Sequence, residues 1–254
     1  MTPFFVGWAG LPRGLYGFVA LVVAGIAAFA AIFATLVLVA LPPRETGSWD
    51  SGDFEGILVT KPYPLVRVPG KGTTPAFSVL LVDDWKFGVA LDPKLRDGDP
   101  VHVQGYALRR GTVTVLQIAA PLRPASDPVG ALPAPRDTGE QAISGEIVDS
   151  KCWAGAMNPG DGKAHRGCGS LCLLGGIPAL FITRGNDKAA SWFVLADAAG
   201  NPLDEAIRAH VGELQTLRGH VFDATDLHEL RLDQASTDRL LQFAAATMPG
   251  SDNR

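Results

Sequence analysis

The sequence lacks most of the patterns that mark an enzyme or a nucleic-acid-binding protein. It has no glycine-rich phosphate loop, no G-x-S-x-G elbow and no H-E-x-x-H pair. Its formal net charge is −4, and no stripe of lysine and arginine is interleaved with aromatic residues. Because proteins bind nucleic acids largely by neutralising phosphates, no nucleic-acid partner is expected. We expect a protein that is not an enzyme and name no catalytic residue.

Charge is missing altogether from one long segment. From Gly14 to Pro43 there is no Asp, Glu, Lys, Arg or His. A helix rises about 1.5 Å per residue, so about twenty apolar residues cross a hydrocarbon core of about 30 Å. We predict an N-terminal segment over residues 1–14 and a transmembrane helix over residues 15–41. A cleaved signal peptide would have a shorter apolar region of about 7–15 residues, which disfavours that interpretation.

This helix predicts a location and two kinds of partner. The lipid bilayer is the first partner, and the alanines and glycines of the helix could pack on other membrane-protein subunits. Arg13 before the span and Arg44 after it nearly balance the positive-inside count. Since long domains translocate largely regardless of charge, we predict a single-pass protein of the cell membrane. Its N-terminus would be cytoplasmic and its domains extracytoplasmic, in the periplasm of a Gram-negative source.

The remaining chain divides into two blocks separated by a proline-rich stretch. Both blocks contain short runs of alternating apolar and polar residues around glycine-rich turns, which is typical of half-buried antiparallel strands. We predict a mainly β fold of two tandem small OB-like β-barrel domains after the transmembrane helix, the second with a helical Cys/His insertion. The predicted parts are residues 53–120 (first domain), 121–140 (linker), 141–235 (second domain) and 236–254 (a partly helical tail).

Each block is predicted to open with a glycine-containing strand and to close with a strand, a turn and a strand. The opening strands are Phe54–Thr60 and Ile143–Asp149. In the first block, Phe77–Val82 and Trp85–Leu91 are predicted to form a central hairpin, and residues 61–75 an irregular loop. In the second block, Ala179–Thr183 and Trp192–Ala196 are predicted to take the place of that hairpin.

The chemistry is concentrated between the first two strands of the second block. The spacing there is C-x12-H-x2-C-x3-C, formed by Cys152, His165, Cys168 and Cys172, and it includes every cysteine of the chain. Residues 164–174 are predicted to form a short helix that ends at Gly175-Gly176. Positions i, i+3 and i+7 fall on one helix face, so His165, Cys168 and Cys172 are expected to lie together. A long loop would let Cys152 reach them.

Four interpretations of this segment remain open. Three thiolates and an imidazole make a tetrahedral set for zinc or copper. In an oxidising compartment, Cys152 would instead form a disulfide with Cys168 or Cys172 and leave one thiol over. Haem or another redox centre ligated by His165 or a thiolate is a third interpretation. A catalytic thiol with His165 as its base is the fourth, although no third orienting group is evident in the sequence.

A family resemblance rests on the same residues. The string GEIVDSKCW…GDGKAHRGCGSLCLLGGIPALFI resembles a family of small bacterial exported or membrane-anchored OB-like domains. Their shared pattern is a strand ending in a Cys, a Gly-rich loop, H-[KR]-x-C-x-x-x-C and a G-[IL]-P strand entry. The resemblance covers chiefly residues 143–183 and implies an extracytoplasmic location and a shared purpose for the segment. The matching positions are Cys152, His165, Arg166, Cys168, Cys172, Gly176 and Pro178.

These observations predict a membrane-anchored extracytoplasmic accessory or binding module that belongs to a redox assembly and does not catalyse a reaction. One alternative is a metal-binding or redox protein that uses Cys152, His165, Cys168 and Cys172 to hold zinc, copper or haem. A second alternative is a structural module with an inert disulfide. The sequence leaves open the ion, the substrate and the partner.

Overall fold

The computed structural model describes residues 12–40, 47–126, 128–130, 132–183, 191–203, 205–224 and 226–247. The chain forms two compact units, Met1–Arg44 and Glu45–Arg254, which are described separately below.

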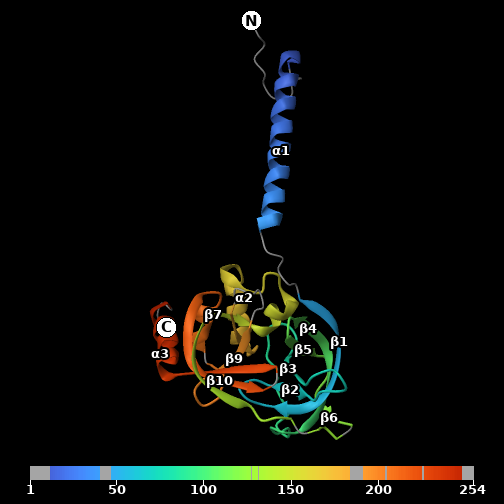
Figure 1. The fold of residues 1–254 in the computed structure, drawn as a ribbon, viewed down its shortest axis with the longest axis vertical. Coiled ribbons are helices and arrows are strands. Elements are labelled where there is room, and N and C mark those ends of the chain that lie inside the picture. Colours follow the sequence, from blue (N-terminus) through green and yellow to red (C-terminus); the bar gives the residue numbers. More distant parts are fainter. Residues whose placement is uncertain are drawn as a thin grey trace, which may run out of the picture. The chain divides into compact units, whose positions relative to one another are not determined.

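The first unit contains one long apolar helix. A short 3-10 turn, η1 (Arg13–Leu15), leads into α1 (Tyr16–Ala40), shown in blue in Figure 1. The span Arg13–Val39, which covers η1 and nearly all of α1, has a mean hydropathy of 2.7, and most of its large apolar side chains are exposed. The predicted N-terminal apolar helix is therefore confirmed, and it is long and apolar enough to cross a membrane. Residue 41, the last of the predicted span, lies outside the described residues.

The second unit begins with a closed five-stranded barrel. Its strands pair in the order β1-β2-β3-β5-β4, and β4 pairs back onto β1 to close the circuit. Only the β3–β5 pair is parallel within this circuit. A two-residue strand, β6, pairs with β4. The strands are β1 (Ser48–Val59), β2 (Leu65–Val68), β3 (Phe77–Val82), β4 (Pro100–Arg110), β5 (Val113–Ile118) and β6 (Arg123–Pro124).

A second closed barrel follows and repeats this topology. Its order is β7-β8-β9-β11-β10, closed by the β10–β7 pair, and the β9–β11 pair is parallel. The prediction of an N-terminal helix followed by two small barrels is therefore confirmed (Figure 1). The strands are β7 (Arg136–Asp149), β8 (Ala179–Ile182), β9 (Trp192–Ala196), β10 (Leu214–Ala224) and β11 (Leu227–Leu232).

Two predictions for the first barrel are wrong. Trp85–Leu91 is not a strand: β3 is followed by a turn in which Asp83 N–H donates to the Phe87 carbonyl over 2.9 Å. The strand that pairs with both β1 and β3 is β2, inside the segment predicted as an irregular loop. β2 is only four residues long and follows Pro62 and Pro64, so its pattern is too short to stand out against those breakers.

The two barrels share one hydrophobic core. A cluster of buried side chains includes Leu65, Leu80 and Val115 of the first barrel together with Phe181 and Leu230 of the second. A second cluster belongs to the first barrel alone. The barrels are therefore packed into one body, which is why residues from both can meet at one site.

Polar contacts also join the barrels. The Asp226 carboxylate, in the β10–β11 turn, accepts hydrogen bonds from the Ser78 backbone N–H at 2.6 Å and from its hydroxyl at 3.1 Å. Burial raises the pKa of this carboxyl, although the two Ser78 bonds oppose the rise.

In its described residues, the second unit also has four helical elements. The π-helical turn η2 (Cys152–Ala156) and α2 (Gly162–Leu174) lie between β7 and β8, where the insertion was expected. The 3-10 turn η3 (Glu205–His210) precedes β10, and α3 (Gln234–Thr247) follows β11.

Candidate metal centre

Three free thiols meet beside the second barrel. Cys152 opens η2 just past the end of β7, and Cys168 and Cys172 lie one turn apart on α2. Their three Sγ atoms all lie within 4.8 Å of one another. Cys152 and Cys172 are buried, and Cys168 is half-buried. The structure thus brings together the three cysteines of the sequence motif.

Helix α2, which carries Cys168 and Cys172, begins and ends at glycines. α2 covers the predicted helix and starts two residues earlier, at Gly162. Its buried face includes His165, Gly169 and Cys172, while Cys168, the i+3 position of the predicted face, lies at the edge of that face and is half-buried. The helix ends at Gly175, and Gly176 adopts a φ of 88°, a left-handed conformation that side-chain-bearing residues rarely take.

His165 lies next to this cluster but makes a different contact. Its Nε2 lies 2.8 Å from Oδ2 of Asp149, the last residue of β7, and both side chains are almost fully buried. With Cys152, these two residues form a second group of potential ligands within 4.8 Å. Only Cys152 belongs to both groups, so the four predicted ligands do not form one mutually close set.

Asp149 is a residue that the sequence reasoning missed. Its other carboxylate oxygen accepts the Cys152 backbone N–H over 2.8 Å, so one buried carboxylate positions both the histidine and the first cysteine. The signal that could have found it is its place, three residues before Cys152 at the end of a buried strand. Gly169 packs closely beside the pair, since a Cβ there would lie 2.8 Å from Val211 Cγ1 and 3.3 Å from Cδ2 of the His165 ring.

The first barrel supplies a cation to the thiols. Lys86, in the turn after β3, places its Nζ 2.8 Å from Cys168 Sγ and 3.6 Å from Cys172 Sγ. The hydrogen bond to Cys168 raises the pKa of Lys86 above its ordinary value. This contact is not evident from the sequence, because Lys86 lies between two aromatic residues in a run predicted as a strand.

A second lysine holds the same turn in place. Lys151 is buried, and its Nζ donates to the carbonyl oxygens of Asp83 at 3.0 Å and Trp85 at 2.8 Å. Burial lowers the pKa of Lys151, while the neighbouring acidic groups, Asp84 first and then Cys172, oppose that effect. Two ammonium groups, one from each barrel, thus neighbour the thiols.

The thiols of Cys152 and Cys172 are not equivalent. Their Sγ atoms are 3.9 Å apart. The hydrogen bond with Cys172 and burial raise the pKa of Cys152, whereas the same hydrogen bond, assisted by Lys86, lowers the pKa of Cys172. Cys172 is therefore the first of the pair to become a thiolate. Because the pKa of Cys152 is raised, its thiol keeps its proton while no ion is bound, which disfavours it as a nucleophile beside His165 even though Asp149 supplies an orienting carboxylate.

The predicted disulfide stays a prediction. All three cysteines are free in this structure, and the 3.9 Å between Cys152 and Cys172 Sγ is nearly twice the S–S bond length of about 2.05 Å.

The other residues of the family pattern have structural contacts. Arg166 Nη1 donates to Glu213 Oε1 over 2.7 Å, and its Nη2 donates to the Ala209 carbonyl. The Pro178 carbonyl accepts the Ser150 N–H over 3.0 Å. These contacts fix α2 and the β8 entry around the thiols.

Gly175 lets the Lys86 turn approach the helix. A Cβ at Gly175 would lie 1.8 Å from the Lys86 carbonyl oxygen, a distance that requires the backbone to move. We expect Gly175→Ala to lower the free energy of unfolding by about 1–3 kcal/mol, as overpacking does. Thermal unfolding of the full chain in detergent measures this effect.

Gly167→Ala on the same helix is the matched control. Nothing lies within 4 Å of a Cβ there, so the substitution should stabilise by about 0.5–1 kcal/mol through helix propensity. If the two substitutions change the free energy of unfolding equally, the Lys86 turn does not approach Gly175 as closely as described.

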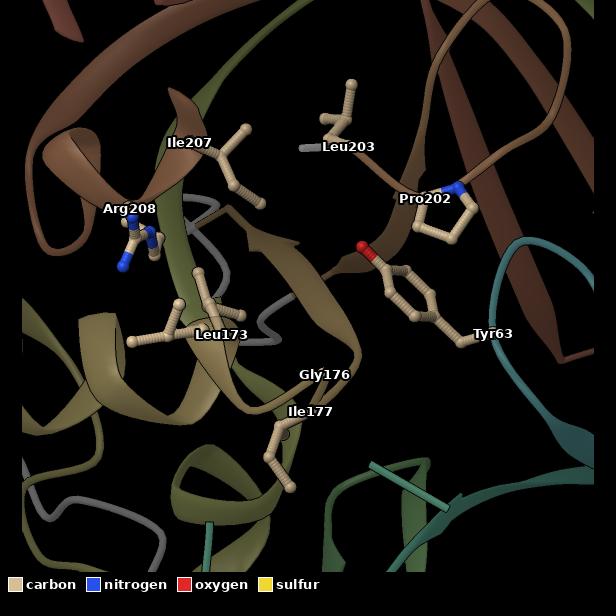
Figure 2. Close-up of a pocket in the computed structure, with 9 residues that line it drawn as sticks. Tyr63, Leu173, Gly176, Ile177, Pro202, Leu203, Ile207 and Arg208 are labelled. Carbon is tan, nitrogen blue, oxygen red and sulfur yellow. The ribbon is translucent and has the colours of Figure 1, made fainter. Parts of the chain in front are cut away.

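A separate pocket of about 190 Å³ lies where the two barrels meet. Figure 2 shows the Tyr63 hydroxyl pointing into it, opposite Ile207 and Leu203. Leu173 and Ile177, which flank the end of α2, line another wall, and Arg208 lies at one side. The walls are mainly apolar, so the pocket suits a small apolar group better than an ion.

Comparisons of this chain with protein-family models, with curated proteins and with solved structures find no match.

Proposed function

We propose that this protein is a membrane-anchored extracytoplasmic binding module that holds one copper(I) ion between Cys152, Cys168 and Cys172. The observation that carries the proposal is the approach of three free Sγ atoms to within 4.8 Å of one another. Thiolates are soft ligands that favour copper(I), zinc and iron–sulfur clusters. A cysteine-ligated cluster takes four cysteines, one more than this chain has.

Charge and ligand number favour copper(I) over zinc. Three thiolates around a monovalent ion carry a net charge of −2, which the ammonium groups of Lys86 and Lys151 offset. A structural zinc site takes four protein ligands. The fourth candidate, His165, is outside the three-thiol group, and its Nε2 pairs with Asp149. A three-coordinate thiolate site therefore fits the described residues best.

The rest of the proposed function follows from the architecture. We place α1 in the lipid bilayer, where its small residues could pack on another membrane protein, with the barrels on the extracytoplasmic side. We assign both barrels to an OB-like class, because each has five strands in a closed circuit with one parallel pair. A non-catalytic accessory role in a redox assembly fits a buried ion site.

Metal loading tests the proposal. The full-length protein in detergent, reduced and titrated anaerobically with copper(I), should bind one equivalent with three sulfur neighbours by X-ray absorption. Zinc bound in preference to copper(I) at equal concentration would overturn the choice of ion. A protein isolated with a disulfide that resists reduction, and that takes up neither ion, would overturn the metal site altogether.

A further inference from the structure

An exposed apolar surface borders the thiol site. It consists of Trp85 and Phe87 on the turn after β3 and of Leu171 and Leu174 on the last turns of α2, and we name it the Trp85 surface. All four side chains are more than half exposed, and Trp85 is 79% exposed. The two segments adjoin: the Gly88 N–H donates to the Gly175 carbonyl over 2.9 Å, and a Cβ at Gly175 would lie 3.4 Å from the Phe87 ring.

The backbone of Trp85 is held in an unusual conformation by hydrogen bonds within and next to its turn. Trp85 has a φ of 53°, and it is the only residue other than glycine with a positive φ in the described part of the chain. A bulky residue in this region is an outlier that the surrounding structure must hold. Its N–H donates to Asp84 Oδ1 over 2.7 Å, and its carbonyl accepts Lys151 Nζ. A large aromatic side chain is thus held in solvent by a rigid, clamped backbone.

The first described residues of the barrel unit, Gly47 and Trp49, contact η2, the element that carries Cys152. Gly47, the first described residue of this unit, packs so closely on η2 that a Cβ there would lie 2.0 Å from the Ala154 carbonyl oxygen. Trp49 Nε1 also donates to the Gly155 carbonyl over 3.0 Å. Only residues 41–46 separate Gly47 from α1 in the sequence. The first described residues of the barrel unit therefore pack on the thiol-bearing insertion.

We propose that the Trp85 surface rests in the headgroup region of the bilayer that holds α1. Tryptophan is enriched at membrane–water interfaces because its ring is apolar and its N–H is polar. Phenylalanine and leucine add apolar area, and Lys86 places a cation beside them. This inference rests on the membrane anchoring proposed above, and it means that the half-exposed Cys168 faces the lipid surface.

Quenching of Trp85 fluorescence by lipid tests the inference. The full-length protein is reconstituted into phosphatidylcholine vesicles whose acyl chains carry bromine near the headgroup, and into vesicles without bromine. The emission assigned to Trp85 is the difference between the wild-type protein and Trp85→Phe. We expect the brominated lipid to remove at least half of that emission.

A relocated tryptophan is the matched control. Thr73 is exposed in the turn between β2 and β3, and that turn and the Trp85 turn leave opposite ends of β3. In the double variant Trp85→Phe with Thr73→Trp, the new tryptophan should not be quenched. Unquenched Trp85 emission, or equal quenching of both positions, would overturn the inference and favour a protein as the occupant of the surface.

Failure of this inference is distinguishable from failure of the proposed function. Resistance of the same vesicles to alkaline extraction reports whether α1 is inserted, and copper(I) stoichiometry reports on the thiols. A protein that is inserted and binds copper, but whose Trp85 is not quenched, would overturn the Trp85 surface alone.

Discussion

Replacing Cys172 by serine should lower the affinity of the chain for copper(I) by more than 100-fold. Cys172 is buried, its Sγ lies 3.9 Å from that of Cys152, and it is the thiol of that pair whose pKa is lowered. A serine hydroxyl is a hard and largely protonated ligand, so the ion would keep only two thiolates. Loss of a partner in the outer shell of a metal site costs about 10–100-fold, and loss of a ligand should exceed that range.

Two further variants, one with a smaller expected loss of copper(I) affinity and one with none, serve as comparisons. Lys86→Gln removes the ammonium at 2.8 Å from Cys168 but leaves every thiol, so we expect a loss within the range of about 10–100-fold. Ser170→Ala on the same helix removes a hydroxyl that donates to the Arg208 carbonyl, and it should leave copper affinity unchanged.

Competition with a copper(I) chelator measures all three affinities. If Cys172→Ser binds copper(I) as tightly as Ser170→Ala does, the three-thiol site is wrong. If Lys86→Gln has no effect, the charge argument for a monovalent ion is wrong, while the site itself stands.

Asp149→Ala should lower the free energy of unfolding by about 3–5 kcal/mol. The Asp149 carboxylate is fully buried, and it accepts the Cys152 N–H and pairs with His165 Nε2. Removing it leaves two buried polar groups without their partner, and breaking a buried pair in this way costs about that much. Asp149→Asn keeps the shape and one acceptor, so it should cost clearly less.

Asp137 provides the matched control for this effect. Its carboxylate also pairs with a histidine, His220, at 3.0 Å, but both side chains are about half exposed. Exposed ion pairs contribute little to stability because water screens them, so Asp137→Ala should leave the unfolding free energy nearly unchanged. Urea unfolding of the full chain in detergent compares the variants. Equal losses for Asp149→Ala and Asp137→Ala would show that burial of the Asp149 pair does not stabilise the fold.

The elements with strong periodic patterns were predictable from sequence, and the weak ones were not. Strands β3 and β9 fall on the predicted residues, and α2 differs from its prediction only at its first turn. β2 could not be found, because a four-residue strand between prolines shows no alternation. The pattern of Trp85–Leu91 predicts a strand because its aromatic and apolar residues alternate with other residues. In the fold, however, Trp85 and Phe87 are exposed, whereas Val89 and Leu91 pack on the core of the first barrel. Lys86 is turned toward the thiols.

The candidate site was predictable only where its residues are close in sequence. The helical spacing of His165, Cys168 and Cys172 places them on one face, and the loop from Cys152 is long enough to return to it. Lys86 could not be placed, since its contact with Cys168 spans 82 residues and two barrels. The position of His165 depends on Asp149, whose role appears only when the end of β7 and α2 are brought together in space.

The division of the site between the barrels determines what a shortened protein could do. A fragment that begins at β7 would keep every thiol, the Asp149–His165 pair and Lys151, but it would lose Lys86 and the turn that Lys151 clamps. The second barrel has the ligands, whereas the first barrel has part of the charge that makes a thiolate cluster tolerable when it is buried. Although they share one topology, the two barrels are not interchangeable, and neither one contains the complete site.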